Sequence, residues 1–179
     1  MSKIHDDFFK GGVFKELIKS LLHKSGYEVY PYGYETTFSA LKNKLAVEDA
    51  RNSPSVRRMK CAPDLVVFDN KRKDLMFVEV KMRSHLPAKI RSDNIEGYKE
   101  FWNDCILVLV VPDENVFYAQ RVSALQAKDY YYPSKDFSKI SEFFQDINES
   151  DLQRYRIMAS NLLSNMRNIM SNPDYSMEK

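Results

Sequence analysis

Residues 63–81 read PDLVVFDNKRKDLMFVEVK, and this stretch decides how the rest of the chain is interpreted. Two short apolar runs rich in β-branched residues, 64–68 and 75–80, flank the polar stretch 69–74. Apolar runs of this length that are bounded by turn-forming residues are typical of β-strands. The pattern therefore predicts a β-hairpin.

The register of this hairpin decides which charged residues meet. If the pairing is symmetric about the turn, so that Asp69 faces Asp74, then Asp64 lies directly across from Glu79. Directly opposed residues share a face of the sheet, with Cβ atoms about 4.5–5.5 Å apart. Lys81 is two residues beyond Glu79 and projects from the same face. We therefore expect two carboxylates and one ammonium at one end of the hairpin.

Two acids that face each other across a buried strand pair need compensating positive charge. Like charges in this position destabilise a sheet, and Lys81 offers one charge against two. A hard divalent cation with oxygen ligands would complete the compensation. The alternative is an exposed ladder of opposite charges on a half-solvated sheet. The neighbouring apolar positions favour a metal site, because charges in strands covered on both faces are costly.

These residues resemble a known motif. Pro63, Asp64, Glu79 and Lys81 match the Pro-Asp and Glu-x-Lys pattern of the PD-(D/E)XK nuclease superfamily, with Holliday-junction-resolvase-like and Mrr-like proteins among its members. The resemblance implies an α/β fold with a restriction-endonuclease-like αβββαβ core. In that core a mixed central sheet is flanked by helices, and here we expect a C-terminal helical extension in addition.

The resemblance also implies roles for individual residues. Asp64, Glu79 and the main-chain carbonyl of Val80 would bind Mg²⁺, with Mn²⁺ able to substitute. Lys81 would position or polarise the attacking water. Many members add a glutamate from the first helix, and Glu16 is the candidate for a catalytic and metal-binding residue here. Judged from its own surroundings, Glu16 is better explained as an exposed partner of Lys19.

A basic segment precedes the motif and indicates a nucleic-acid partner. Residues 51–60 hold four basic side chains and no acid, and residues 1–100 hold 19 basic and 14 acidic residues against 8 and 11 in residues 101–179. A basic loop beside a metal site suits contacts with the phosphates of a nucleic acid. We expect DNA as the partner rather than RNA. The candidate nucleic-acid-binding residues are Arg51, Arg57, Arg58, Lys60, Arg83 and, weakest, Lys99. The alternative is a solvated loop without a partner.

Composition excludes several other classes of protein. No stretch is apolar for the length that a membrane crossing needs, and the N-terminus lacks a signal-peptide pattern, so we expect an intracellular, cytoplasmic protein. Cys61 and Cys105 are too few for a disulfide scaffold and lack the spacing of a zinc motif. The three histidines are not spaced as a ligand set.

The remaining elements follow from periodicity and from capping residues. Helical spacing predicts a first helix that begins near Asp6 or Asp7 and ends at Gly26, and a second that begins at Ser92 or Asp93 and contains Tyr98. Tyr98 suits core packing, although such a residue can also reach a phosphate. Further predictions are strands at 27–34, 105–111 and 117–122 and helices at 37–50, 136–148 and 151–170.

Two regions result from this order. Residues 1–135 would form the nuclease-like core, with a basic insertion at 37–60, and residues 136–179 a C-terminal helical extension. The apolar seam of the last helix comprises Leu152, Tyr155, Ala159, Leu162, Met166 and Ile169. A seam of this kind either packs on the protein's own core or forms a homodimer interface.

The sequence therefore predicts a metal-dependent nuclease, and the activity that it favours is that of a DNA endonuclease. The alternative is an inactive nucleic-acid-binding or assembly module on the same fold.

Overall fold

The computed structural model describes residues 3–33, 53–86, 88–89, 92–125, 130–131 and 137–171. The predicted helix 37–50 and Arg51 lie outside these residues.

A mixed sheet of six strands forms the centre of the described part of the molecule. In spatial order its strands are β1 (Glu28–Pro31), β2 (Leu65–Asp69), β3 (Asp74–Met82), β5 (Ile106–Val111), β6 (Val116–Arg121) and β8 (Ser138–Lys139). The β3 and β5 strands are parallel, and every other neighbouring pair is antiparallel. Two short strands, β4 (Ala88–Lys89) and β7 (Tyr130–Tyr131), pair separately.

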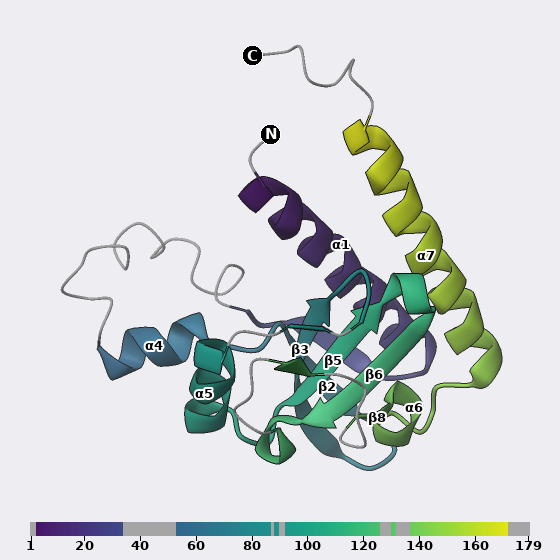
Figure 1. Cartoon of the computed structure of the whole chain (residues 1–179). Coiled ribbons are helices and arrows are strands. Elements are labelled where there is room, and N and C mark those ends of the chain that lie inside the picture. The colour runs from purple at the N-terminus through teal and green to yellow at the C-terminus, as the bar shows by residue number, and fades with distance from the viewer. Residues whose placement is uncertain are drawn as a thin grey trace.

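Helices lie against both faces of this sheet (Figure 1). They are α1 (Lys3–Lys24), α4 (Pro54–Lys60), α5 (Ser92–Phe101), α6 (Ile140–Phe143) and α7 (Glu149–Ser171), with 3-10 turns η2 (Pro112–Glu114) and η3 (Val122–Ala124). The order α1, β1, β2, β3, α5, β5 is the predicted helix, three strands, helix and strand. The predicted α/β class, mixed sheet and core order are therefore confirmed.

Strand periodicity divides the core into two layers. On β3, Val78 and Val80 belong to one apolar cluster together with side chains of α1 and α7. Their neighbour Glu79 pairs with Leu107 of β5, which belongs to a second cluster with Ile95 of α5. Because successive strand residues point to opposite faces, the acidic residue faces α5 while the valines face α1 and α7.

The first helix ends where the sequence predicts. Gly26 has a φ of +91°, a left-handed conformation that favours glycine. Its N–H donates to the carbonyl of His23 at 3.0 Å, and the N–H of Ser25 donates to the carbonyl of Leu21 at 3.0 Å. The chain then enters β1, whose place at the edge of the sheet accommodates Pro31.

The long C-terminal helix packs within the molecule, lying beside α1 in Figure 1. Five of its residues, Leu152, Tyr155, Ala159, Leu163 and Met166, are buried in the core cluster that includes α1. Leu162 packs partly against that cluster, and Ile169 at the end of the predicted seam is 55% exposed. The seam therefore serves the protein's own core along most of its length.

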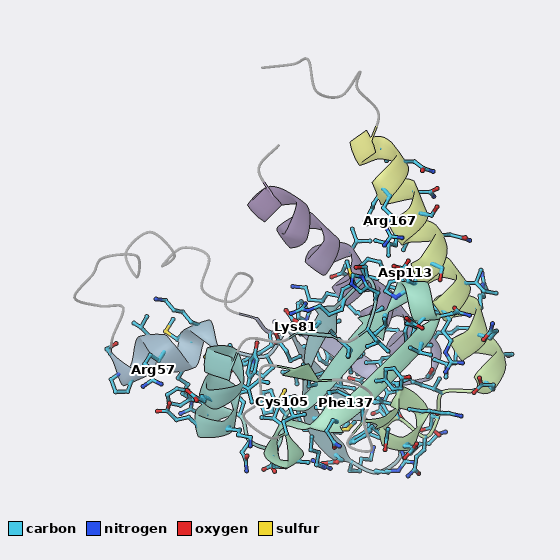
Figure 2. All side chains as sticks on the ribbon, in the orientation of Figure 1. Arg57, Lys81, Cys105, Asp113, Phe137 and Arg167 are labelled. Atoms are coloured by element: carbon cyan, nitrogen blue, oxygen red, sulfur yellow. The ribbon has the colours of Figure 1, made fainter. Side chains whose placement is uncertain are left out.

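Polar contacts fix the position of α7 as well. Tyr155 and Ser20 of α1 share a hydroxyl–hydroxyl hydrogen bond of 2.8 Å, and Ser160 donates to the carbonyl of Pro112 at 2.6 Å. Arg167 forms two hydrogen bonds of 2.8 and 2.7 Å with the Asp113 carboxylate, the pair labelled in Figure 2.

The predicted helix over residues 136–148 is wrong. Of its described residues, 138–139 form β8 and 140–143 form the single turn α6, because Ile140 and Phe144 turn into the core directly after the sheet edge. Asn148 then begins the last helix, since its side-chain oxygen accepts the N–H of Asp151 at 2.8 Å.

Among the helices that the structure describes, none is long and apolar enough to cross a membrane.

Candidate active site

The β2–β3 hairpin has the predicted register. Asp69 pairs with Asp74 and Leu65 pairs with Val78, and this pairing places Asp64, one residue before β2, opposite Glu79. Glu79 is 3% exposed and is one of the two buried acidic residues of the described part of the chain, the other being Asp69. Asp64 is partly buried.

Reciprocal hydrogen bonds hold the two carboxylates in place. The backbone N–H of Asp64 donates to Glu79 Oε2 at 3.1 Å, and the backbone N–H of Val80 donates to Asp64 Oδ2 at 3.0 Å. Each acid thus accepts an N–H from the strand segment that holds the other acid. These two hydrogen bonds fix both side chains relative to the backbone of the hairpin.

Glu79 Oε1 has two further donors. Lys81 Nζ forms an ion pair and hydrogen bond with it, and the Tyr98 hydroxyl of α5 donates to the same oxygen at 2.6 Å. The Lys81 ammonium also lies 5.8 Å from the centre of the Tyr98 ring. Lys81 therefore shares the face of Glu79, as the alternation of strand residues predicts.

Burial and the neighbouring charges together set the protonation of this cluster. Burial raises the pKa of the Glu79 carboxyl, an effect that the Lys81 ammonium opposes and the Asp64 carboxylate reinforces. Burial alone would lower the pKa of Lys81, but Glu79 and Asp64 outweigh it and leave that pKa raised. Burial and the nearby Glu79 carboxylate raise the pKa of Tyr98 well above its usual value. Lys81 and Tyr98 are therefore protonated donors at neutral pH.

Val80 directs its backbone toward the same place. Its N–H reaches Asp64, and in an extended strand the N–H and C=O of one residue point to the same edge. The Val80 carbonyl is therefore directed past the start of β2, on the side of Asp64. Two carboxylates and a carbonyl are oxygen donors of the type that hard divalent cations prefer, so the residues present fit Mg²⁺ or Mn²⁺.

The first helix supplies a lysine to this cluster. Lys15 Nζ lies 3.5 Å from Asp64 Oδ1, and the two side chains are 21% and 24% exposed. Glu16, the predicted metal ligand, instead pairs with Lys19 at 3.1 Å, and its side chain is 61% exposed. The structure thus brings Lys15 to Asp64 and leaves Glu16 on the outer side of α1.

The end of β1 secures the residue that carries the first carboxylate. The backbone N–H groups of Tyr32 and Gly33 donate to the carbonyl of Asp64 at 2.9 and 3.2 Å. The edge strand therefore continues its contact with the hairpin beyond its last paired residue. Asp64 is held through its N–H, its carbonyl and its carboxylate.

The basic segment before the motif is partly helical, which corrects the prediction of a loop. Ser53 caps α4, since its hydroxyl accepts the N–H of Val56 at 3.3 Å, and Pro54 occupies the first helical position. Arg57 and Arg58 lie on this helix and Lys60 ends it, all three exposed.

Both arginines of α4 have partners on or just after α5. Arg57 pairs with Glu100 at 2.8 Å, and the Arg58 guanidinium lies 5.4 Å from the centre of the Trp102 ring. In Figure 2, Arg57 lies on α4, apart from the labelled Lys81. The structure therefore places the basic helix beside α5, with its arginines outside the carboxylate cluster.

The two remaining basic candidates flank the site. Arg83 follows β3, donates its backbone N–H to the Val110 carbonyl at 2.9 Å and, through its guanidinium, contacts the carbonyl of Met82 at 2.7 Å. Lys99 lies on α5 next to Tyr98 and is partly buried.

Within the described ranges, no group of three or more His, Cys, Asp or Glu side chains gathers where it could hold a metal ion. The candidate ligand set depends instead on Asp64, Glu79 and a main-chain oxygen.

Two residues of the cluster did not enter the predicted site. The sequence favours core packing for Tyr98, and this residue is indeed buried, but its hydroxyl also donates to Glu79. For Lys15, the sequence offers only its place next to Glu16 on the predicted first helix. Both contacts join residues far apart in sequence, which no local pattern records.

Fold and site together define an α/β protein with two carboxylates and a lysine gathered where β2 begins beside β3. No family model matches the sequence, and the search of curated proteins finds no match. Among solved structures, the chain is similar to Hjc, a Holliday junction resolvase from the archaeal hyperthermophile Archaeoglobus fulgidus. The identity is 19%, the TM-score is 0.49, and the alignment covers 75% of this chain and 94% of that chain. The likeness is one of fold alone.

Proposed function

We propose that this chain is a metal-dependent nuclease that hydrolyses phosphodiester bonds in nucleic acid, as a DNA endonuclease in the first instance. The observation that carries the proposal is the pairing of Asp64 with Glu79, with Lys81 hydrogen-bonded on the same face. A pair of facing acids, of which Glu79 is buried and Asp64 partly buried, is costly for a fold, so it is best explained by chemistry that needs both.

The Asp64 and Glu79 carboxylates and the Val80 carbonyl would hold the metal ion. When bound, Mg²⁺ or Mn²⁺ supplies Lewis-acid polarisation of a phosphate oxygen and lowers the pKa of water. Glu16 stays a prediction as a further ligand, and its exposed pairing with Lys19 gives it no support.

Lys81 provides positive charge next to the reacting groups. Its raised pKa keeps the ammonium protonated, so it acts as a donor and not as a base. Held by Glu79, it can orient a water molecule and offset negative charge that develops on the phosphate. Tyr98 acts through Glu79, since its hydroxyl fixes the oxygen that also binds Lys81.

The nucleic acid would extend from this cluster toward α4. Arg58 and Lys60 are exposed on a helix that holds no acidic residue, and Arg83 follows β3 beside Lys81. Basic side chains at such positions contact phosphates and position the strand without reading its sequence. Arg51 and Lys99 stay candidates for the same role.

The test is cleavage of a panel of single-stranded, duplex, flapped and four-way DNA, with matched RNA, in Mg²⁺ or Mn²⁺. Asp64→Asn should reduce cleavage by about 100-fold or more, because one charged ligand is lost. The asparagine oxygen can still accept the Val80 N–H, so the fold should persist, as circular dichroism can check. Lys81→Ala should reduce cleavage to a similar extent.

Asp74→Asn is the matched control, because Asp74 lies at the other end of the same hairpin and is exposed. It should cleave as the wild type does. Full activity in either Asp64→Asn or Lys81→Ala would contradict the proposal. Nucleic-acid binding without cleavage, together with no heat of Mg²⁺ or Mn²⁺ binding in calorimetry, would favour the inactive binding module.

A further inference from the structure

The charges in the carboxylate cluster sum to zero without any metal. Asp64 and Glu79 contribute two negative charges, and Lys15 and Lys81 contribute two positive charges. The sequence suggests one lysine against two acids, and the structure adds a second lysine from α1. A divalent cation that entered beside both lysines would meet two positive charges within a few ångströms.

The four carboxylate oxygens differ in the hydrogen bonds that they accept. Glu79 Oε1 accepts from Lys81 and Tyr98, and Glu79 Oε2 accepts the backbone N–H of Asp64. Asp64 Oδ2 accepts the backbone N–H of Val80. The fourth oxygen, Asp64 Oδ1, has an ammonium at 3.5 Å, which is longer than a good hydrogen bond.

The two lysines differ in how firmly they are placed. Lys81 extends from the central strand β3, hydrogen-bonds Glu79 and lies against the Tyr98 ring. Lys15 reaches Asp64 from a separate helix through a single long ion pair. A lysine side chain on a four-carbon stem can withdraw from such a contact at low cost.

We propose that Lys15 is an internal counter-ion of Asp64 that competes with the divalent metal and is displaced when the metal binds. The inference rests on the proposed function, since it concerns the same site. Lys15 stabilises the metal-free carboxylate and weakens metal binding. Once displaced, its ammonium lies near the metal ligands and is available to a phosphate of the substrate.

The experiment is a Mn²⁺ titration of the full chain by calorimetry, without nucleic acid and at constant pH. Lys15→Met should bind Mn²⁺ more tightly than the wild type by about tenfold or more, because a unit charge near a partly buried carboxylate competes strongly. Lys15→Arg keeps the charge and should stay within about threefold of the wild type.

The matched control is Lys19→Met, one turn further along α1, whose ammonium pairs with Glu16. It removes the same charge from the protein and should leave Mn²⁺ affinity within about twofold, since its ammonium pairs with Glu16 and not with Asp64. If Mn²⁺ affinity rose equally in Lys19→Met and Lys15→Met, the net charge of the protein would explain the effect, and the inference would be overturned.

Two further outcomes separate this inference from the proposed function. If the wild type binds Mn²⁺, Asp64→Asn does not, and Lys15→Met binds no more tightly than the wild type, the competition is wrong while the metal site stands. If neither the wild type nor Lys15→Met binds Mn²⁺, both proposals fail.

Discussion

Asp64 and Glu79 are joined through each other's strand segments: the Asp64 N–H donates to Glu79, and the Asp64 carboxylate accepts the N–H of the residue after Glu79. The geometry of the pair is therefore set by the backbone of the hairpin. Side chains from two helices, Lys15 of α1 and Tyr98 of α5, then approach it. Variants at these outer positions can test the site without disturbing the pair itself.

Tyr98→Phe should slow cleavage by about tenfold through kcat, with KM little changed. The phenylalanine ring keeps the buried packing, but Glu79 loses the donor at 2.6 Å and keeps Lys81. Loss of one buried hydrogen bond should cost about 1 kcal/mol in the free energy of unfolding. Steady-state kinetics and urea unfolding measure the two effects. An unchanged kcat would show that the hydroxyl serves stability alone.

Glu16→Gln should leave cleavage within about threefold of the wild type, because an exposed ion pair contributes little. The carboxylate is placed at Lys19, not at Asp64. The same substrate and metal as for Asp64→Asn give the comparison. A loss near 100-fold would instead establish Glu16 as the ligand that the family resemblance implies.

Asp69→Asn should lower the free energy of unfolding at pH 7 by about 1–3 kcal/mol, because a buried acceptor loses its charge. Asp69 accepts the N–H groups of Lys71 and Arg72 at 2.9 and 3.0 Å and pairs with the Arg72 guanidinium. Burial alone would raise its pKa, but the N–H donors and the guanidinium of Arg72 leave the pKa lowered.

The pH dependence of that difference follows from the sign of the shift. A carboxylate with a lowered pKa in the folded state contributes stability above its unfolded pKa, about 3.9, and loses it as the pH falls through the folded pKa. Urea unfolding of the wild type and Asp69→Asn should therefore converge below about pH 4. The exposed partner in the register provides the control: Asp74→Asn should change stability by less than about 0.5 kcal/mol at either pH.

Gly97→Ala should change the free energy of unfolding in opposite directions in the wild type and in Cys61→Ala. A Cβ at Gly97 would lie 2.4 Å from the Cys61 sulfur, so the substitution should destabilise the wild type by about 1 kcal/mol or more. Without that sulfur, the next atom is the Cys61 Cβ at an ordinary 3.6 Å. In Cys61→Ala, the higher helix propensity of alanine should then stabilise the protein by up to about 1 kcal/mol.

Thermal unfolding of the four proteins forms a double-mutant cycle. A destabilising effect of the same size in both backgrounds would show that contact with Cys61 is not the reason for a glycine within α5.

The hairpin could be predicted because its information is local. Apolar runs on either side of a polar turn determine the pairing, and the Asp69–Asp74 register then places Asp64 and Glu79 without reference to the rest of the chain. The helices at 3–24, 92–101 and 149–171 were also predicted, apart from a few residues at their ends. Their periodic apolar faces are local signals of the same kind.

The errors have two different causes. Ser53 and Pro54 form a start signal for a helix, so the sequence contains the information that predicts α4. The high density of basic residues in the same segment favours a loop instead. The places of Lys15 and Glu16 depend on how α1 is rotated against the sheet. Adjacent helical residues point about 100° apart, so a small rotation decides which of the two faces Asp64.

The balance between two acids and two lysines means that folding of the protein need not depend on the metal that its proposed activity would need. Since the chain neutralises its own cluster, it can fold where free divalent ions are scarce, and under the proposed function it would bind them afterwards. A chelator should then abolish cleavage without unfolding the protein, and added metal should restore cleavage without a refolding step.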